Sequence, residues 1–502
     1  MTVERWGVFE LSFIGKTDGN PFTDYTISGS FKSDNESVTV KGFYNGDGVY
    51  KIRFMPSYMG EYTYSVCGSF SDEEFHGRFS VTAPSGNNHG PVKVAKKYHF
   101  AYADGTPMYP LGTTCYVWNL QSDELIEKTL ESLKSSPFNK IRFCVFPKHY
   151  DYNLGEPRSY PYVGTPMDSS VLNRDNFWGF DGSTKGNDWD FERFNPKHFE
   201  HIEKCILSLC ELGIEADIIL FHPYDRWGFS QMSARYDDMY LEYVVARFSA
   251  YRNVWWSLAN EYDLMRKKTH EDWQRFAKVI MENDSYDHLR SIHNCIGFYD
   301  HTEPWVTHCS IQRQDIYRTT EYTDEWRSRY DKPVVLDEIA YEGDIQHGWG
   351  NITGDELTRR FWEAALRGGY GGHSETYLPS DGILWWSHGG ELKGTSYKRI
   401  AFLMDILKQT PGLGLKRGQG QWDDVCGVPE DDELAKETGY RIHYYSFMRP
   451  SFREFYFEDD VKYVVEVIDT WNMTVENRGV FSGKCRIDLP ATPYMAIRVR
   501  KA

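Results

Sequence analysis

The first part of the chain alternates between apolar and polar residues in short runs. Between Trp6 and Thr82, runs such as ESVTVKGFY, GVYKIRFM and RFSVT are separated by clusters of Gly, Asn and Asp. A period of two residues is typical of strands with one buried face, and the NGDG segment at 45–48 is typical of a hairpin turn. We therefore predict an N-terminal antiparallel β-sandwich over residues 1–91, ending in the linker-like stretch APSGNNHGP.

From about Val92 onward, strand-like apolar runs are separated by long amphipathic segments. Segments such as DELIEKTLESLKS and EDWQRFAKVIMEN have the periodicity of helices. Strands that alternate with helices in this number predict a closed (β/α)8 TIM barrel over residues 92–410. The eight strands are expected at residues 107–118, 140–147, 214–224, 253–262, 290–294, 306–312, 332–338 and 371–378.

Strand-like runs return after the last helix-like segment, which ends at Pro411. Among them are IHYYSFM, KYVVEVIDTW and YMAIRVR, so residues 411–502 are predicted to form a further domain. The predicted fold class is therefore an α/β multidomain protein. In it, the central barrel is flanked by the N-terminal antiparallel β-sandwich and a small C-terminal β-domain.

One connection within the predicted barrel is unusually long and aromatic. It runs over residues 147–196, far beyond the length of an ordinary βα loop. Aromatic residues make up 16% of the whole chain, and flat rings beside acidic side chains suit a sugar-binding surface. We expect this loop to be a substrate wall or lid built with Tyr150, Tyr152, Tyr160, Tyr162, Trp178 and Trp189.

Acidic residues outnumber basic ones, with 73 Asp and Glu against 56 Lys and Arg, which gives a net charge of −17. This charge disfavours a nucleic-acid partner or an anionic membrane surface. The segment MTVERWGVFELSF lacks the basic start and apolar core of a secretory signal, and the nine cysteines include no CxxC pair. We therefore expect a cytoplasmic protein with free thiols, while its oligomeric state stays open.

Two of the apolar runs end in carboxylates. The run NVWWSLANEY contains Asn260-Glu261, and KPVVLDE ends with Asp337-Glu338. Reacting groups of a (β/α)8 barrel lie at the carboxyl ends of its strands, so Glu261 and Glu338 are expected to face each other across the barrel mouth. Two carboxyls in one apolar cleft titrate apart, as glycoside cleavage requires. Asp337, one step from Glu338, is expected to point elsewhere and form a structural ion pair.

This pattern resembles that of the clan A glycoside hydrolases, which are retaining enzymes. Their acid/base Glu follows an Asn at the end of strand 4, and their nucleophile Glu ends strand 7. The resemblance implies that Glu338 is the nucleophile, Glu261 the acid/base, and Asn260 the residue that bonds the sugar 2-hydroxyl. The order of the three domains is also similar to that of apiosidase-like enzymes.

Further substrate-binding candidates lie at other strand ends. Arg142, on the second strand, corresponds to the clan's arginine beside the nucleophile. At the end of strand 6, where the clan often has His or Tyr, this sequence offers Gln312 or His308. The remaining candidates are His222, His293, Glu375, Trp385 and Trp386.

Several of these candidates also have a structural alternative. His222 and His293 are as compatible with hydrogen bonds inside the barrel as with a sugar contact. Glu375 suits either a sugar hydroxyl or an arginine partner. Of the adjacent Trp385 and Trp386, we expect at least one in the core and the other beneath a sugar.

The proposed chemistry also requires particular surroundings for the two glutamates. A charge-assisted contact from Arg142 is expected to keep the pKa of Glu338 low. Burial beside Trp255 or Trp256 is expected to raise the pKa of Glu261, so that it arrives protonated.

We therefore predict a retaining, exo-acting glycoside hydrolase that cleaves neutral plant-type oligosaccharides without a metal or other cofactor. One alternative is a metal-dependent barrel enzyme of the sugar isomerase type. Another is a catalytically silent glycan-binding protein. His198 and His201 share a helix face, but they lack the HExxH arrangement of zinc enzymes, and a solvated face is the simpler explanation.

Overall fold

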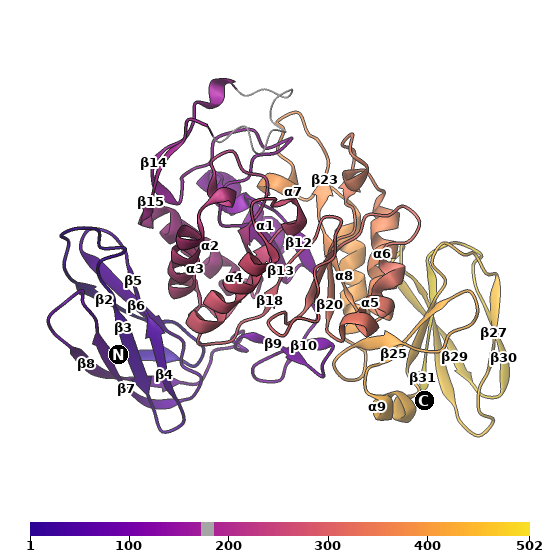
Figure 1. The fold of residues 1–502 in the computed structure, drawn as a ribbon. Helices are drawn as coiled ribbons and strands as arrows, with labels where there is room; N and C mark the ends of the chain where they lie inside the picture. The colour runs from indigo at the N-terminus through magenta and orange to yellow at the C-terminus, as the bar shows by residue number, and fades with distance from the viewer. Residues whose placement is uncertain (172–184) are drawn as a thin grey trace.

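The computed structural model describes residues 1–171 and 185–502, in which three parts follow one another from the N-terminus to the C-terminus (Figure 1). A β-domain lies on one side of a central barrel and a second β-domain on the other. The predicted fold class is confirmed. Trp178 of the long aromatic loop lies outside the described residues.

The N-terminal part consists of two sheets around one apolar core. A five-stranded sheet has the order β1-β8-β7-β3-β4 and a three-stranded sheet the order β2-β6-β5. All pairs are antiparallel except β1 with β8, and the predicted turn at 45–48 joins β5 to β6. The strands are β1 (Thr2–Glu4), β2 (Phe9–Ile14), β3 (Ser28–Lys32), β4 (Ser37–Lys41), β5 (Phe43–Tyr44), β6 (Val49–Phe54), β7 (Gly60–Cys67) and β8 (Phe75–Thr82).

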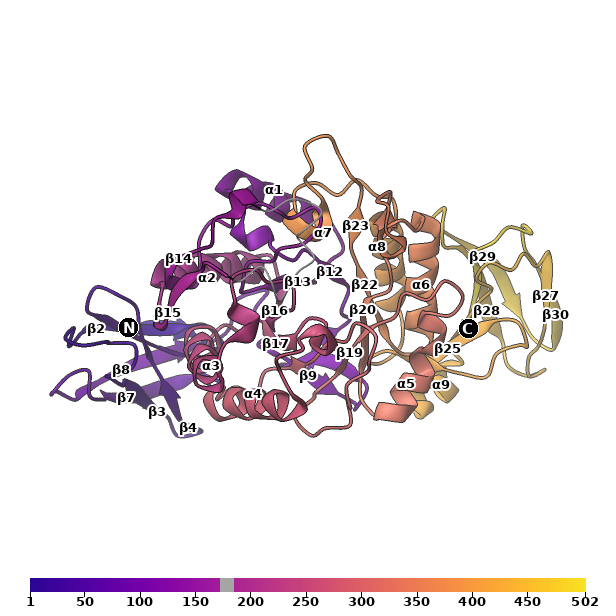
Figure 2. The same cartoon turned by 45° about the horizontal axis from the view of Figure 1, so that its top comes forward.

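All eight predicted barrel strands are present and parallel. Their order is β18-β17-β16-β13-β12-β22-β20-β19, and a bridge between His293 and Ser310 connects the two ends of this sheet. Figure 2 shows these strands around the centre of the molecule, with helices outside them. The strands are β12 (Gly112–Thr114), β13 (Lys140–Cys144), β16 (Glu215–Phe221), β17 (Val254–Ala259), β18 (Arg290–Ser291), β19 (Cys309–Gln312), β20 (Val334–Glu338) and β22 (Tyr370–His373).

The barrel helices have sequence-encoded ends. Ser122 caps α1 by accepting from the backbone N–H of Leu125, and Thr269 forms a capping box with Asp272 at the start of α4. The segment between β18 and β19, residues 292–308, contains no helix. The helices are α1 (Asp123–Lys134), α2 (Pro196–Glu211), α3 (Ala234–Phe248), α4 (His270–Asn283), α5 (Thr323–Tyr330), α6 (Gly354–Leu366), α7 (Trp385–His388) and α8 (Ser396–Leu407).

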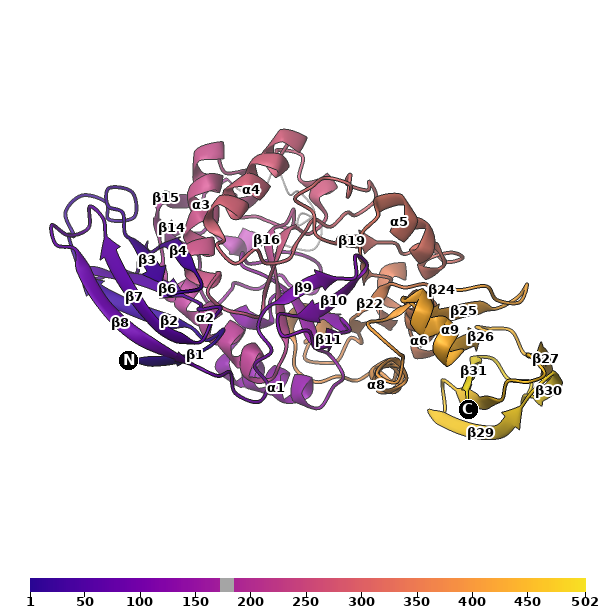
Figure 3. The same cartoon turned by 90° about the horizontal axis from the view of Figure 1, so that it is seen from below.

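The lower end of the barrel is closed by a small sheet of β9 (Val92–Ala95), β10 (His99–Tyr102) and β11 (Pro107–Met108), which Figure 3 shows from below. Phe100 of this sheet packs on Trp255, with ring centroids 5.3 Å apart. Only the opposite end of the barrel, where the carboxyl ends of the strands lie, is left for a site.

The C-terminal part is a six-stranded antiparallel sheet with a two-stranded partner, and α6 of the barrel contacts its β24 and β25. The short helix α9 (Asp432–Thr438) follows β25. The strands are β24 (Leu415–Arg417), β25 (Val425–Pro429), β26 (Arg441–Tyr444), β27 (Phe452–Tyr456), β28 (Tyr463–Asp469), β29 (Thr474–Phe481), β30 (Lys484–Asp488) and β31 (Met495–Lys501). Among the described residues, no helix is both long and apolar enough to cross a bilayer.

Candidate active site

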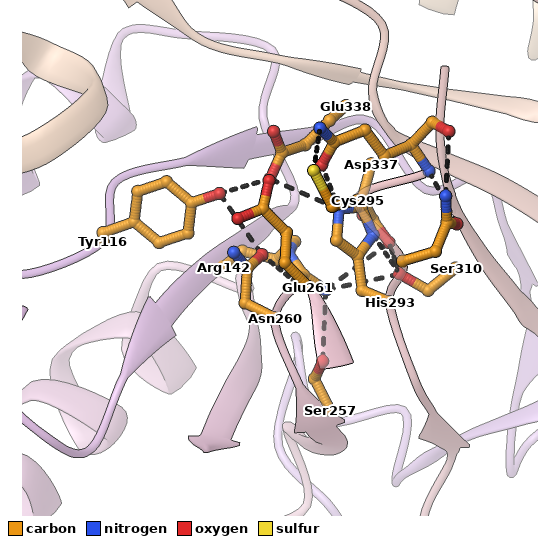
Figure 4. A network of polar contacts seen from close by, with 12 residues as sticks. Tyr116, Arg142, Ser257, Asn260, Glu261, His293, Cys295, Ser310, Asp337 and Glu338 are labelled. Carbon is orange, nitrogen blue, oxygen red and sulfur yellow. Dashed lines mark hydrogen bonds and ion pairs between the residues drawn. The ribbon is translucent and has the colours of Figure 1, made fainter. Parts of the chain in front are cut away.

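Two glutamates lie beside each other at the open end of the barrel. Glu261 lies two residues after the end of β17 and Glu338 is the last residue of β20; they are 5% and 4% exposed. Figure 4 shows the two carboxyl groups together, beside the phenol of Tyr116. Glu261 has a φ of 51°, a left-handed conformation that is costly for a non-glycine residue and concentrates at functional sites. The structure thus brings together the two carboxylates that the strand-end pattern singles out.

The surroundings of Glu338 favour its ionised form. Burial alone raises the pKa of this carboxyl, but its partners more than offset burial and lower the pKa below its usual value. Nε2 of His293 lies 3.3 Å from Oε1 of Glu338, and the hydroxyl of Tyr116 donates a hydrogen bond to the same oxygen. The charge of Lys148 acts in the same direction.

The surroundings of Glu261 favour its protonated form. Burial and the negative charge of Glu338 both raise the pKa of Glu261. A hydrogen bond from the hydroxyl of Tyr224 and the charge of Lys148 oppose this rise but do not cancel it. One mouth therefore holds two neighbouring carboxyl groups whose pKa values are shifted in opposite directions.

The amide of Asn260 has a fixed orientation. Its Oδ1 accepts from Nη2 of Arg142 at 3.1 Å and lies 3.3 Å from the hydroxyl oxygen of Tyr116. Its Nδ2 is buried and has no hydrogen-bond partner among the described residues. Because a buried donor without a partner is costly, this N–H group is available to a bound ligand.

Arg142 does not make the contact with Glu338 that the sequence predicts. Its guanidinium bonds Asn260 and lies 3.5 Å from both Asp217 and Asp337, while Lys140 lies within 2.8 Å of the same two aspartates. Arg142 therefore influences Glu338 only through space. The structural ion pair expected for Asp337 is present, and these charges lower the pKa of Asp337 strongly.

The prediction that Trp255 or Trp256 borders Glu261 is wrong. The indole N–H of Trp255 donates to Glu215, and that of Trp256 donates to Asp284. Both tryptophans lie several residues before the end of β17. The ring of Trp255 therefore packs lower in the barrel, and the ring of Trp256 packs on its outside. The rings that enclose Glu261 come from loops instead.

The histidine and glutamine candidates separate into two groups. His293 contacts Glu338, and its Nε2 also lies 3.1 Å from Oε1 of Gln312, so Gln312 orients the imidazole. Gln312 ends β19, whereas His308 packs against Trp255 at the lower end of the barrel. His222 follows β16, with Nε2 3.3 Å from the carbonyl of Phe146.

Glu375 is bound by backbone N–H groups, and no ion pair with a described arginine accompanies them. It begins the short strand β23 (Glu375–Thr376), and its carboxylate accepts from the backbone N–H groups of Lys393 and Gly394. The arginine pairing predicted as one alternative for Glu375 is therefore not observed, because residues 393–394 fold back over its carboxylate. Burial, together with nearby Glu342, raises the pKa of Glu375 to about 7.

The two adjacent tryptophans have different surroundings. Trp385 belongs to the main core, and its indole N–H donates to Thr113 at 2.9 Å. Trp386 lies at the barrel mouth, with its ring centroid 5.4 Å from that of Tyr116 and 4.9 Å from that of Trp349. Of the pair, only Trp386 is therefore placed to contact a ligand.

Three residues near the glutamates were missed by the sequence analysis. Tyr116, Lys148 and Tyr224 follow β12, β13 and β16 by two, four and three residues. The strand-end rule, extended by a few residues into each loop, would have included them. Their sequence types gave no separate signal, because Tyr and Lys are common in loops.

Two loops meet over one side of the mouth. His347, which follows β20, lies 3.4 Å from Asp151, which follows β13. Their neighbours Trp349 and Tyr150 are also in contact, with ring centroids 6.4 Å apart. Because β12 and β22 lie between β13 and β20 in the sheet, this arch of residues 150–151 and 347–349 spans the ends of those two strands.

Among the residues that the structure describes, no group of three His, Cys, Asp or Glu is placed to hold a metal ion. His198 and His201, the histidines on α2, contact the carbonyls of Val145 and Asn119, and the predicted solvated face is wrong for His198, which is buried against the barrel.

Three family models match the chain. Residues 94–407 match the model of the apiosidase-like catalytic domain. Residues 2–68 and 422–500 match two domains of unknown function, DUF5060 and DUF5605. No curated protein matches the chain.

Among solved structures, a Bacteroides vulgatus protein assigned to the glycoside hydrolases is 36% identical. The match covers 100% of both chains with a TM-score of 0.90. A glycoside hydrolase of family 5 from the same organism shares the fold, with 16% identity over 82% of this chain and 94% of its own, at a TM-score of 0.58.

Proposed function

The chain belongs to the apiosidase-like family and is a glycoside hydrolase, and from this premise we propose that it works with retention of configuration. The observation that carries the proposal is the placement of two glutamates side by side at the barrel mouth, Glu261 after Asn260 beyond β17 and Glu338 at the end of β20, which is the pattern of the retaining clan A enzymes. The pKa of Glu338 is lowered and that of Glu261 is raised, as a carboxylate and a neighbouring acid require in either a retaining or an inverting mechanism.

In the first step, a carboxylate oxygen of Glu338 forms a bond to the anomeric carbon. The glycosidic C–O bond breaks, its electron pair stays on the leaving oxygen, and Glu261 gives its proton to that oxygen. In the second step, Glu261 takes a proton from water, whose oxygen bonds the anomeric carbon and releases the ester with Glu338. Asn260 donates its free N–H to the 2-hydroxyl throughout.

We further propose that the substrates are neutral plant-type oligosaccharides cleaved from one end. The leaving group departs on the side of Glu261 and β17. The sugar that stays bonded to Glu338 after the first step therefore lies toward β12 and β22. The arch between Asp151 and His347 spans that side and supports exo-action. The rings of Tyr116 and Trp386 offer apolar faces to a sugar.

The decisive experiment follows the anomeric configuration of the first product by NMR, using the aryl glycoside that the wild type hydrolyses fastest. Retention supports the proposal, and an inverted first product contradicts it. Glu338→Ala is expected to abolish turnover, and azide is expected to restore part of it as glycosyl azide. Glu261→Ala is expected to lower activity by about 10² to 10⁴-fold on poor leaving groups but to spare activated ones.

A further inference from the structure

A lysine that the proposed mechanism does not use lies among the aromatic rings of the site. Lys148 follows β13 and is 3% exposed. Its Nζ lies 3.3 Å from the ring centroid of Tyr116, 4.2 Å from that of Tyr224 and 4.6 Å from that of Trp386. Among the described residues, none forms a hydrogen bond or ion pair with this ammonium, and the ring faces of the three aromatic residues lie beside it, so its N–H donors are available to a ligand.

The two tyrosines under this ammonium lead directly to the two glutamates. The hydroxyl of Tyr116 donates to Glu338, and that of Tyr224 donates to Glu261. Lys148 thus lies over both donors, and its charge lowers the pKa of both glutamates. His293 also lowers the pKa of both glutamates, from its place beside Glu338.

The charges deeper in the barrel are already balanced. Lys140 and Arg142 lie between Asp217 and Asp337, which makes two cations and two anions. The positive charge of Lys148 is therefore the one left to balance the single negative charge shared by Glu261 and Glu338. That charge is on Glu338 before the first step and on Glu261 after it, so the lysine has a partner in both states.

On the basis of the proposed function, we propose that Lys148 is a substrate-binding residue whose ammonium donates hydrogen bonds to hydroxyl oxygens of a neutral sugar bound against Tyr116, Tyr224 and Trp386. It also supplies the positive charge shared by Glu261 and Glu338. A neutral sugar fits this balance. The carboxylate of a uronic acid would add a second negative charge next to Glu338 in a buried site, where like charges repel strongly.

The pH dependence provides a readout that a merely structural lysine would not change. Burial lowers the pKa of Lys148 itself to about 8. Besides Tyr116 and Tyr224, the titratable or charged groups that act on it or respond to its charge are Arg142, Cys144, Tyr150, His222, Glu261 and Glu338. Removing its charge raises the pKa of both glutamates, so both limbs of the kcat/KM profile should move to higher pH.

The test compares Lys148→Met with Lys148→Gln on the neutral aryl glycoside that the wild type hydrolyses fastest. Lys148→Met should lower kcat/KM by roughly 10 to 100-fold, since it removes hydrogen bonds from a charged donor. Lys148→Gln keeps a neutral hydrogen-bond donor, so its KM should return toward the wild-type value. Both limbs of its pH profile should stay at higher pH than those of the wild type, because the charge is still absent. Lys128→Met, at an exposed lysine on α1 that pairs with Glu391, is the matched control and should behave as wild type. Unchanged KM and an unchanged pH profile in a folded Lys148→Met protein would overturn the proposal.

A binding experiment separates failure of this proposal from failure of the proposed function. If no glycoside is hydrolysed, the proposed function fails, but calorimetric titration of neutral monosaccharides and the matching uronic acids still tests Lys148. We expect a neutral sugar to bind at least tenfold more weakly to Lys148→Met. Equal binding overturns the inference, as does a wild-type preference for the uronic acid that Lys148→Met loses.

Discussion

The hydroxyl of Tyr116 donates a hydrogen bond to Oε1 of Glu338, and the tyrosine ring is itself buried at 2% exposure. Burial raises the pKa of this carboxyl, whereas this donor and His293 lower it and so favour the carboxylate form. The same hydroxyl lies 3.3 Å from Oδ1 of Asn260. Tyr116 thus connects the proposed nucleophile to the proposed 2-hydroxyl donor.

Tyr116→Phe is expected to raise the pKa of Glu338 and to move the acid limb of kcat/KM to higher pH. Since Glu338 acts in its ionised form and its pKa is lowered, we expect the wild-type acid limb at a lower pH than an unperturbed glutamate would give. Losing a hydrogen bond to a charged group should lower kcat/KM by roughly 10 to 100-fold at pH 5. Tyr50→Phe, which removes a buried hydroxyl in the N-terminal domain, is the control. An unmoved acid limb in Tyr116→Phe would count against this role.

Asn260→Ala is expected to affect only substrates that carry a 2-hydroxyl. Arg142 and Tyr116 occupy Oδ1, so the free N–H group is the part of this amide that can reach a sugar. We expect kcat/KM to fall by roughly 100-fold on the aryl glycoside but much less on its 2-deoxy analogue. Steady-state kinetics measure kcat/KM of the wild type and of Asn260→Ala on each of the two substrates. Equal losses on the two substrates would show that Asn260 acts on the fold and not on the 2-hydroxyl.

The periodicity of the sequence was sufficient to predict all eight barrel strands and, through their carboxyl ends, Glu261 and Glu338. This worked because the strands are mainly apolar and the polar residues at their carboxyl ends lie at the barrel mouth, whereas a carboxylate within a strand, such as Asp337, is used in an ion pair inside the barrel. Contacts made by loops could not be predicted in this way. Glu375 illustrates the limit, because its carboxylate is occupied by residues 393–394, which return to it from beyond α7.

The same limit explains the error about Trp255 and Trp256. Their type and distance along the chain suggested an apolar wall for Glu261, but adjacent residues of a strand point to opposite sides and lie about 3.3 Å apart along it. A residue five or six positions earlier therefore cannot reach the strand end. The rings at the mouth come instead from loops after β12 and β16, whose path has no periodicity to read.

Glu375 is expected to make the stability of the protein depend on pH. Its pKa is raised to about 7 in the folded protein, mainly by burial, against about 4.5 in an unfolded chain. A raised pKa contributes stability fully below pH 4.5 and loses it as the pH rises through 7. By pH 8 the free energy of unfolding is expected to be lower by on the order of 3 kcal/mol.

Glu375→Gln removes this titration, so its Tm should fall less than that of the wild type between pH 5 and pH 8. Calorimetry at both pH values measures the difference. A constant offset between the two proteins is expected as well, because the amide replaces one of two acceptors for the N–H groups of Lys393 and Gly394. Glu391→Gln, an exposed carboxylate on the same loop, is the control. Parallel Tm curves for wild type and Glu375→Gln would contradict the raised pKa.

The arch over β12 and β22 is expected to decide where a chain of sugars can be cut. If this contact closes one end of the cleft, then removing its side chains in the double variant His347→Ala and Trp349→Ala should let longer chains extend past β12 and β22. We expect the wild type to release single units from one end of a labelled oligosaccharide, and the double variant to cut internal bonds as well, with kcat on the aryl glycoside within about threefold of wild type. Chromatography of early products distinguishes the two patterns. Internal cleavage by the wild type, or an identical product pattern in the double variant, would show that the arch does not limit the cleft.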